Sequence, residues 1–310
     1  MSRGVAALGA RVAAAALLLL FAAGACREPE GVSRENVRVV SLSPSTTEAM
    51  FAIGAGALLV GRTRQCDYPP AAAQVAVVGD YAQPVLERLL ALSPTLVIGE
   101  ANAGSATLGE QLRAVGIEAW FPPAGSTAEV GAMLTELGSR LGHKREGEGA
   151  REAMNVALAR IAEWAKAREG VRVVMVLDTR PLFVVGPGSF LDEMLRLAGG
   201  TNAIDSGGPF PTIDVERLLA LDPDVVIDAS AMGDGGVSEL ASAPSFSRLR
   251  AVKEGRVRRL ASAAALRPGP RLASGLEDLT QALHGLAPPR DPGPNAPARL
   301  PTESSAAPPP

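Results

Sequence analysis

Two apolar segments of the chain have nearly the same sequence. Residues 87–98 read ERLLALSPTLVI and residues 216–227 read ERLLALDPDVVI, with the first six positions identical. In each copy leucines precede a proline, which disfavours helix at the residue before it, and a run of aliphatic residues follows. Each copy therefore predicts a short helix, a turn and a buried strand of the kind that lies in the centre of a parallel sheet.

The two halves that contain these copies also begin alike. Residues 38–42 and 172–177 are both rich in valine and leucine, and each predicts a strand. In the first half, Ser45 and Glu48 have the spacing of a capping box, which predicts a helix that stops near Gly54. Strands that alternate with helices indicate a parallel α/β sheet.

The second half repeats this order of elements. Ser189 and Asp192 are expected to open a helix that ends at Gly199 and Gly200. The sequence therefore predicts an α/β fold with two similar lobes, each a mainly parallel sheet flanked by helices.

Helical patterns fill the region between the two halves. Ser126 and Glu129 form a further capping box, and residues 144–168 carry large apolar side chains at helical spacing. At ~1.5 Å per residue this second helix would extend roughly 37 Å. We expect one long rigid helix to join the two lobes, with a ligand cleft between them.

The first residues have the pattern of a secretory signal. Arg3 and Arg11 lie in a start without acidic residues, and a short apolar stretch, 12–23, follows. That stretch is shorter than the roughly 20 residues that span a bilayer as a helix. The small residues directly before Cys26 resemble the lipobox of bacterial lipoproteins, which implies that Cys26 is lipidated. The alternative is an ordinary cleaved signal with an incidental cysteine.

Charge and cysteine content narrow the possible partners, and composition marks the predicted parts of the chain. The net charge of −3 gives no reason to expect a nucleic-acid partner. Once Cys26 is lipidated, Cys66 has no partner, so we expect no disulfide. The predicted parts are a signal peptide (1–25), a tether (26–36), an N-terminal lobe (37–143), a bridging helix (144–169), a C-terminal lobe (170–286) and a disordered tail rich in Pro and Ala (287–310).

Several short motifs together resemble a known family. They are RVVSLSPSTTE at 38–48, CDYPP at 66–70, LERL at 86–89, GGTN at 199–202 and RPGPR at 267–271. In this order they resemble the class III periplasmic binding proteins, which receive cobalamin, haem or ferric siderophores for ABC importers. The DYPP segment is most similar to the cobalamin-binding members. The resemblance implies two lobes joined by one long helix.

The resemblance also places candidate ligand residues. Tyr68 and Tyr81 are the only tyrosines, and an aromatic ring with a hydroxyl offers a flat apolar face and a polar handle to a corrin or porphyrin. Phe210 and Phe183 fall at further pocket positions of the family, although each is equally consistent with an ordinary core residue. Glu100 stands at about the place where cobalamin receptors often carry Trp.

Basic residues offer a second kind of ligand contact. Arg267 and Arg180 have the planar fork that pairs with ligand carboxylates, and the alternative for Arg180 is a plain surface charge. His143 and His284 have no metal-ligand partner at helical spacing. Cys66 is expected to be a small packed residue beside Tyr68, and the alternative is an axial metal ligand. The sequence predicts no metal site.

Glu87 and Glu216 occupy matching places in the repeat. In the family resemblance, one Glu on each lobe docks onto Arg residues of the permease, and such charges favour orientation and association rate. The alternative is that each Glu merely complements a helix dipole.

Together these features predict a receptor that binds a ligand and catalyses no reaction. The chain contains no Gly-x-Ser-x-Gly, P-loop or His-Glu-x-x-His motif. We expect a monomeric lipoprotein, anchored in the cell envelope and exposed to the periplasm, that delivers a corrinoid such as cobalamin to an ABC permease and needs no covalent cofactor. A haem or ferric-siderophore receptor is the alternative within the class, and an envelope sensor or an enzyme on the same scaffold is the alternative outside it.

Overall fold

The computed structural model describes residues 37–81, 83–168, 170–230 and 238–289 of the 310-residue chain. These residues form two compact units. The first unit contains the described residues up to Ser43 together with Ala55–Phe121, and the second contains Pro44–Gly54 and the described residues from Pro122 onward. The predicted signal peptide, Cys26, the tether 26–36 and the tail beyond residue 289 lie outside the described residues.

The first unit is built on a parallel sheet with the strand order β3-β2-β1-β6-β7. Its strands are β1 (Val39–Ser41), β2 (Leu59–Arg62), β3 (Ala76–Val77), β6 (Leu96–Ile98) and β7 (Glu118–Trp120). The helices of this unit are α3 (Leu86–Ala91), α4 (Ser105–Ala114) and the short 3₁₀ turns Gly56–Leu58 and Pro70–Gln74. A two-stranded antiparallel hairpin, β4 (Gly79–Asp80) with β5 (Gln83–Pro84), precedes α3.

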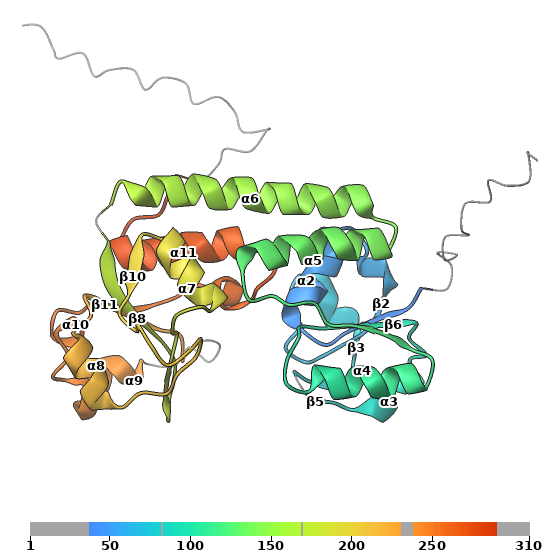
Figure 1. The fold of residues 1–310 in the computed structure, drawn as a ribbon, viewed down its shortest axis with the longest axis horizontal. Coiled ribbons are helices and arrows are strands. Elements are labelled where there is room, and N and C mark those ends of the chain that lie inside the picture. The colour runs from blue at the N-terminus through green and yellow to red at the C-terminus, as the bar shows by residue number, and fades with distance from the viewer. Residues whose placement is uncertain (1–36, 82, 169, 231–237, 290–310) are drawn as a thin grey trace, which may run out of the picture. The chain divides into compact units, whose positions relative to one another are not determined.

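Apolar side chains from the sheet and from its two helices form the core of the first unit. Val40 and Val97 from neighbouring strands are fully buried, as are Leu89 of α3 and Leu112 of α4. Because both helices contribute to this single cluster, both pack against the sheet (Figure 1).

The second unit contains a sheet with the order β10-β8-β11-β12, in which all pairs are parallel, and β9 pairs antiparallel to β8. Its strands are β8 (Val171–Thr179), β9 (Leu182–Val184), β10 (Gly200–Asn202), β11 (Val225–Asp228) and β12 (Val257–Arg259). Its helices are α2 (Pro44–Ala52), α5 (Thr127–Arg140), α6 (Lys144–Lys166), α7 (Phe190–Leu197), α8 (Val215–Leu221), α9 (Glu239–Ser242), α10 (Arg250–Lys253) and α11 (Leu272–His284), with 3₁₀ turns at Pro244–Phe246 and Ala263–Leu266.

The predicted long helix is present as α6, which lies alongside α5 and α11 in the second unit (Figure 1). Two glycines allow α5 and α6 to approach closely. A Cβ on Gly138 would lie 2.7 Å from the His143 carbonyl oxygen, and one on Gly147 would lie 2.6 Å from the Leu134 carbonyl oxygen. Among the described residues, α6 and the other helices are all too short or too polar to cross a membrane.

The internal repeat of the sequence is a repeat of the fold. The first copy forms α3 and β6, and the second forms α8 and β11. Leu89 and Leu218, at matching positions, are both fully buried. The residues before the two prolines, Ser93 and Asp222, both have positive φ, at 46° and 40°, so both copies turn through a left-handed residue before the proline.

Two arginines repeat the same contacts in the two units. Arg38 donates from its Nε and Nη2 to the Leu92 carbonyl oxygen (3.0 and 2.8 Å), and Arg172 donates from its Nη2 to the Leu221 carbonyl oxygen (3.1 Å). Each arginine therefore satisfies a carbonyl at the C-terminal end of the repeat helix. The predicted fold class, two similar α/β units with mainly parallel sheets, is confirmed. The exact boundaries of the predicted domains stay a prediction.

The capping motifs have different outcomes. Ser126 and Ser189 accept hydrogen bonds from the backbone N–H groups of Glu129 and Asp192, so both predicted helix starts are confirmed. The predicted capping box at Ser45 and Glu48 is wrong. Helix α2 begins at Pro44, so Ser45 lies inside it, and the buried carboxylate of Glu48 accepts hydrogen bonds from arginine side chains of the same unit.

Candidate ligand site

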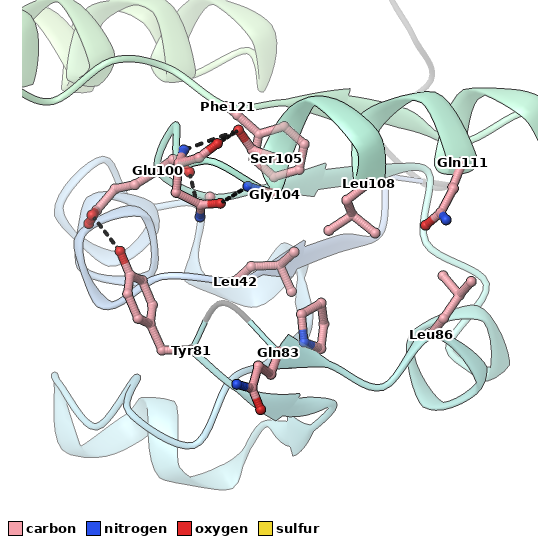
Figure 2. Close-up of a pocket in the computed structure, with 13 residues that line it drawn as sticks. Leu42, Tyr81, Gln83, Leu86, Glu100, Gly104, Ser105, Leu108, Gln111 and Phe121 are labelled. Atoms are coloured by element: carbon pink, nitrogen blue, oxygen red, sulfur yellow. Dashed lines mark hydrogen bonds between the residues drawn. The ribbon is translucent and has the colours of Figure 1, made fainter.

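A cavity of about 220 Å³ opens at the carboxyl edge of the sheet in the first unit (Figure 2). Leu42 follows β1, Gly99 and Glu100 follow β6, and Phe121 follows β7. The carboxyl ends of parallel strands are the usual place for a ligand in an open α/β sheet. The described lining is completed by Tyr81, Gln83, Pro84, Leu86, Asn102, Gly104, Ser105, Leu108 and Gln111.

The apolar floor of the cavity depends on Gly99. A Cβ at this position would lie 3.2 Å from the Leu42 Cβ and 3.3 Å from the Phe121 ring. Because these contacts are tighter than ordinary van der Waals packing, the missing side chain lets Leu42 and Phe121 both lie close to the end of β6. Leu108 of α4 extends the same apolar surface.

Tyr81 and Glu100 meet at one end of the cavity (Figure 2). Tyr81 stands in the turn of the β4–β5 hairpin, and its hydroxyl donates to Glu100 Oε2 at 3.1 Å. Burial of the phenol, followed by the charge of the Glu100 carboxylate, raises the pKa of Tyr81 above its ordinary value. The pair therefore holds Tyr81 as a neutral phenol beside a carboxylate.

Neutral polar groups form the rest of the rim. The Asn102 side-chain oxygen accepts from the Gly104 N–H at 2.9 Å, and the Ser105 hydroxyl donates to the Asn102 carbonyl oxygen at 2.8 Å. These bonds form a tight turn at the start of α4. Gln83 and Gln111 add two further amide side chains to the lining, so the rim offers both donors and acceptors.

The loop that carries Tyr68 is held by a buried arginine. Arg62, which is 9% exposed, donates to the carbonyl oxygens of Ala72 (2.7 Å) and Thr63 (3.1 Å), and to two further carbonyls of the same loop. Tyr68 is 43% exposed in this loop and is not among the residues that line the cavity.

The Tyr68 loop and the Tyr81 hairpin are bonded to each other. Gln65 Oε1 accepts from the Tyr81 N–H at 2.8 Å, and Arg64 Nε lies 2.9 Å from Asp80 Oδ1. The two tyrosines therefore stand on connected segments of one unit.

Cys66, in the Tyr68 loop, is fully buried, and its sulfur lies 3.1 Å from the Thr63 hydroxyl. This location agrees with the expected packing role. Among the described residues, no group of three or more His, Cys, Asp or Glu side chains is placed to hold a metal ion.

The two candidate phenylalanines form a pair in the second unit. The ring centroids of Phe183, on β9, and Phe210 lie 6.0 Å apart with an interplanar angle of 34°. Phe210 is 41% exposed, so part of its ring faces solvent. An aromatic surface of this kind suits contact with a flat apolar ligand, and the assignment of both residues stays a prediction.

The two candidate arginines are engaged within the second unit. Arg267 lies 3.4 Å from Glu48, which also receives a two-pronged contact from Arg271. Arg180 donates to Glu239. Neither arginine lines the cavity of the first unit.

Glu87 and Glu216 are both exposed and are the second residues of α3 and α8. Such helices run antiparallel to the strands they precede, so both glutamates lie towards the carboxyl edge of their own sheet. The docking role of both glutamates stays a prediction. Of the residues predicted from the sequence, Tyr81 and Glu100 line the cavity, whereas Leu42, Phe121 and the cavity residues of α4 were missed. The only signal for the cavity was Gly99, a glycine directly after a buried strand.

The Tyr81–Glu100 pair predicts an unusual alkaline titration. In a Tyr68→Phe variant Tyr81 is the only tyrosine, and we expect its tyrosinate absorbance to appear well above pH ~10. The raised pKa also means that protonated Tyr81 stabilises the fold below pH ~10, a contribution lost as the pH rises through the raised value. Adding Glu100→Gln should move the midpoint down. A midpoint near 10 with Glu100 intact would contradict the pairing.

Comparison with known proteins gives three relevant likenesses. A family model described as "Periplasmic binding protein" matches residues 39–264. The chain is 33% identical over 201 residues to the vitamin B12-binding protein of Salmonella paratyphi A, covering 64% of this chain and 74% of that protein. It is 28% identical to the uncharacterized ABC transporter substrate-binding lipoprotein YvrC of Bacillus subtilis, covering 82% of each.

Among solved structures, the chain is similar to the periplasmic haem-binding protein RhuT from Roseiflexus sp. RS-1 in its apo form. The TM-score is 0.73 at 28% sequence identity, and the match covers 80% of this chain and 98% of that one.

Proposed function

The chain belongs to the periplasmic binding protein family, and from this premise we propose that it is the substrate-binding lipoprotein of an ABC importer with a corrinoid such as cobalamin as its ligand. The family match spans residues 39–264, and the curated relatives that match over most of their length include several vitamin B12-binding proteins. The proposal concerns binding and delivery, with no catalytic step and no covalent cofactor.

The cavity of the first unit is the observation that carries the choice of ligand. Its apolar floor of Leu42, Leu108 and Phe121, next to the Tyr81 ring, suits the edge of a macrocycle. A volume of about 220 Å³ is smaller than the ~300–1,000 Å³ of sites that enclose a whole ligand, so the cavity receives one edge of the ring. The neutral amide rim complements the amide groups at the periphery of a corrin.

Haem is the alternative ligand, supported by the likeness to the haem-binding protein RhuT. Tyrosinate is a known axial ligand of haem iron, and Tyr81 lies at the cavity. The hydrogen bond to Glu100 and the raised pKa of Tyr81 oppose the deprotonation that iron ligation requires. An anionic siderophore is disfavoured because the described lining of the cavity carries no Arg or Lys.

The partner in this proposal is an ABC permease. Exposed Glu87 and Glu216 would dock the two units onto basic residues of the permease, and Cys26 would carry the lipid that holds a monomeric receptor in the cell envelope, facing the periplasm. The likeness to a substrate-binding lipoprotein supports this arrangement. No nucleic-acid partner is proposed. The alternative outside transport is an envelope sensor, which would bind a ligand without delivering it to a permease. For a sensor, the two glutamates would have no role in uptake.

Ligand binding tests the proposal directly. The chain from residue 27 onward, purified in soluble form, is titrated with cyanocobalamin, cobinamide, haemin and a ferric siderophore, with absorbance and calorimetry as readouts. We expect saturable binding of one corrinoid per chain and weaker binding of haemin. Preferential binding of haemin would move the ligand to the alternative, and a lack of binding to all four would refute the metal-chelate assignment.

A further inference from the structure

We propose that Glu100 is a specificity-determining residue of the cavity, which selects macrocycles edged with amides over macrocycles edged with carboxylates. This inference rests on the proposed function, because it concerns the same site and the same class of ligand. It assigns a chemical role to Glu100, the acidic side chain of the described cavity lining.

The charge of the cavity is the first observation behind this proposal. Among the described residues that line it, Glu100 is the only one with a formal charge, and the others are apolar or neutral polar. Two like charges in a partly desolvated site repel each other more strongly than they do in water. A ligand that brings a carboxylate to this edge therefore meets the repulsion of a like charge, whereas an amide does not.

The position of the carboxylate is the second observation. Tyr81 donates to Glu100 Oε2 at 3.1 Å, and the preceding Gly99 packs against Leu42 and Phe121 at the end of β6. The hydrogen bond therefore fixes the carboxylate at the end of the cavity where Tyr81 stands (Figure 2). A preorganised charge discriminates better than a mobile one, because it does not move away from an unfavourable ligand group.

The hydrogen-bonding capacity of the rim is the third observation. Gln83, Asn102 and Gln111 each carry one amide, which both donates and accepts, while Glu100 accepts only. A primary amide on the ligand donates to the carboxylate and pairs reciprocally with the amide side chains. A ligand carboxylate has no proton to donate to Glu100, so an acceptor faces an acceptor. Specificity in this arrangement comes from a repulsive element as well as an attractive one.

Matched pairs of ligands test the selection. The first pair is cobinamide and cobyrinic acid, which share a corrin ring but carry amides and carboxylates respectively at its edge. We expect the unmodified chain to bind the amide form at least about tenfold more tightly. Glu100→Gln should bring the two dissociation constants to within about threefold of each other, mainly by improving the binding of the carboxylate form.

The second pair, haemin and its dimethyl ester, makes the test independent of the corrin ring. If the unmodified chain binds no corrinoid, the proposed function fails, and Glu100 is still tested by its effect on this pair. We expect the ester to be preferred, and Glu100→Gln to remove the preference. Equal affinity ratios in the unmodified chain and in Glu100→Gln, for every pair that binds, would overturn the inference.

Two control variants separate a charge effect from a structural one. Tyr81→Phe removes the hydrogen bond to Glu100 but keeps the charge, so the preference for the amide form should persist even if overall affinity falls. Glu110→Gln neutralises an exposed acid on α4 that does not line the cavity, and it should leave the ratio unchanged. A ratio that collapses in Tyr81→Phe while Glu100→Gln keeps it would show that the phenol, and not the carboxylate, selects the ligand.

Discussion

Reversing the charges of Glu87 and Glu216 together is expected to lower uptake of cyanocobalamin by more than about tenfold, while binding of the ligand to the purified chain stays unchanged. Both side chains are exposed at matching positions, and neither lines the cavity. A lysine in place of each glutamate would turn attraction to the basic residues of a permease into repulsion, and like charges at an interface cost several kcal/mol. Each single reversal should give a smaller loss.

The measurement is uptake of radiolabelled cyanocobalamin in cells whose genomic copy of the chain is deleted, complemented with each variant. The matched control is Glu118→Lys with Glu152→Lys, which also replaces one exposed acid in each unit and changes the net charge equally. Glu118 begins β7 and so lies at the amino edge of its sheet. Normal uptake by the Glu87 and Glu216 variant would refute the docking role and leave helix-dipole complementation as the remaining interpretation.

Replacing Glu48 by alanine is expected to lower the free energy of unfolding of the second unit by about 3–5 kcal/mol. The Glu48 side chain is 2% exposed, and its carboxylate accepts from Arg271 Nε (2.8 Å) and Nη2 (2.6 Å) and lies 3.4 Å from Arg267. Truncation leaves two guanidinium groups, 22% and 19% exposed, beside an emptied space. Removing one member of a largely buried ion pair costs far more than removing one member of an exposed pair.

The two tryptophans allow this effect to be measured in the second unit alone. Trp120 lies in the first unit and Trp164 in the second, so a Trp120→Phe background leaves fluorescence that reports on the second unit during urea unfolding. Glu163→Ala removes an exposed i,i+3 partner of Lys166 and should cost less than about 1 kcal/mol. A Glu48→Ala loss as small as that of Glu163→Ala would contradict the buried network.

Local sequence patterns were enough to predict most of the framework. The six identical residues at 87–92 and 216–221 predicted a helix, a turn and a strand twice, and both copies have this structure. The serine caps at Ser126 and Ser189 were also predictable, because a cap depends on neighbours three residues away.

Contacts between segments that are distant in the sequence could not be predicted from these local patterns. The spacing of Ser45 and Glu48 predicted a cap, but the partners of Glu48 lie 219 and 223 residues further along the chain. Their combined charge outweighs the local hydrogen bond that a capping box provides. No periodic pattern in the sequence contains these partners, so tertiary structure alone reveals them.

The candidate site was predictable only in part for the same reason. Tyr81 and Glu100 were found individually, but their hydrogen bond depends on a hairpin and a strand end that the fold brings together. The floor residues Leu42 and Phe121 are 79 positions apart and belong to different strand ends. Their side chains are ordinary apolar ones, and nothing local distinguishes them from the core.

The paired contacts of Arg38 and Arg172 lie on the opposite edge of the sheet from the residues that line the cavity. Arg38 directly precedes β1 and Arg172 is the second residue of β8, so both arginines bind the ends of the repeat helices at the amino edge of their sheet, while the cavity of the first unit lies at the opposite, carboxyl edge. After duplication of an ancestral half-receptor, the arginine contacts at the amino edge would be kept, and the ligand residues at the carboxyl edge would diverge. Grafting of carboxyl-edge loops from related receptors onto this scaffold is therefore a practical route to new ligand preferences, since the grafted segments would leave the helix–strand joints intact.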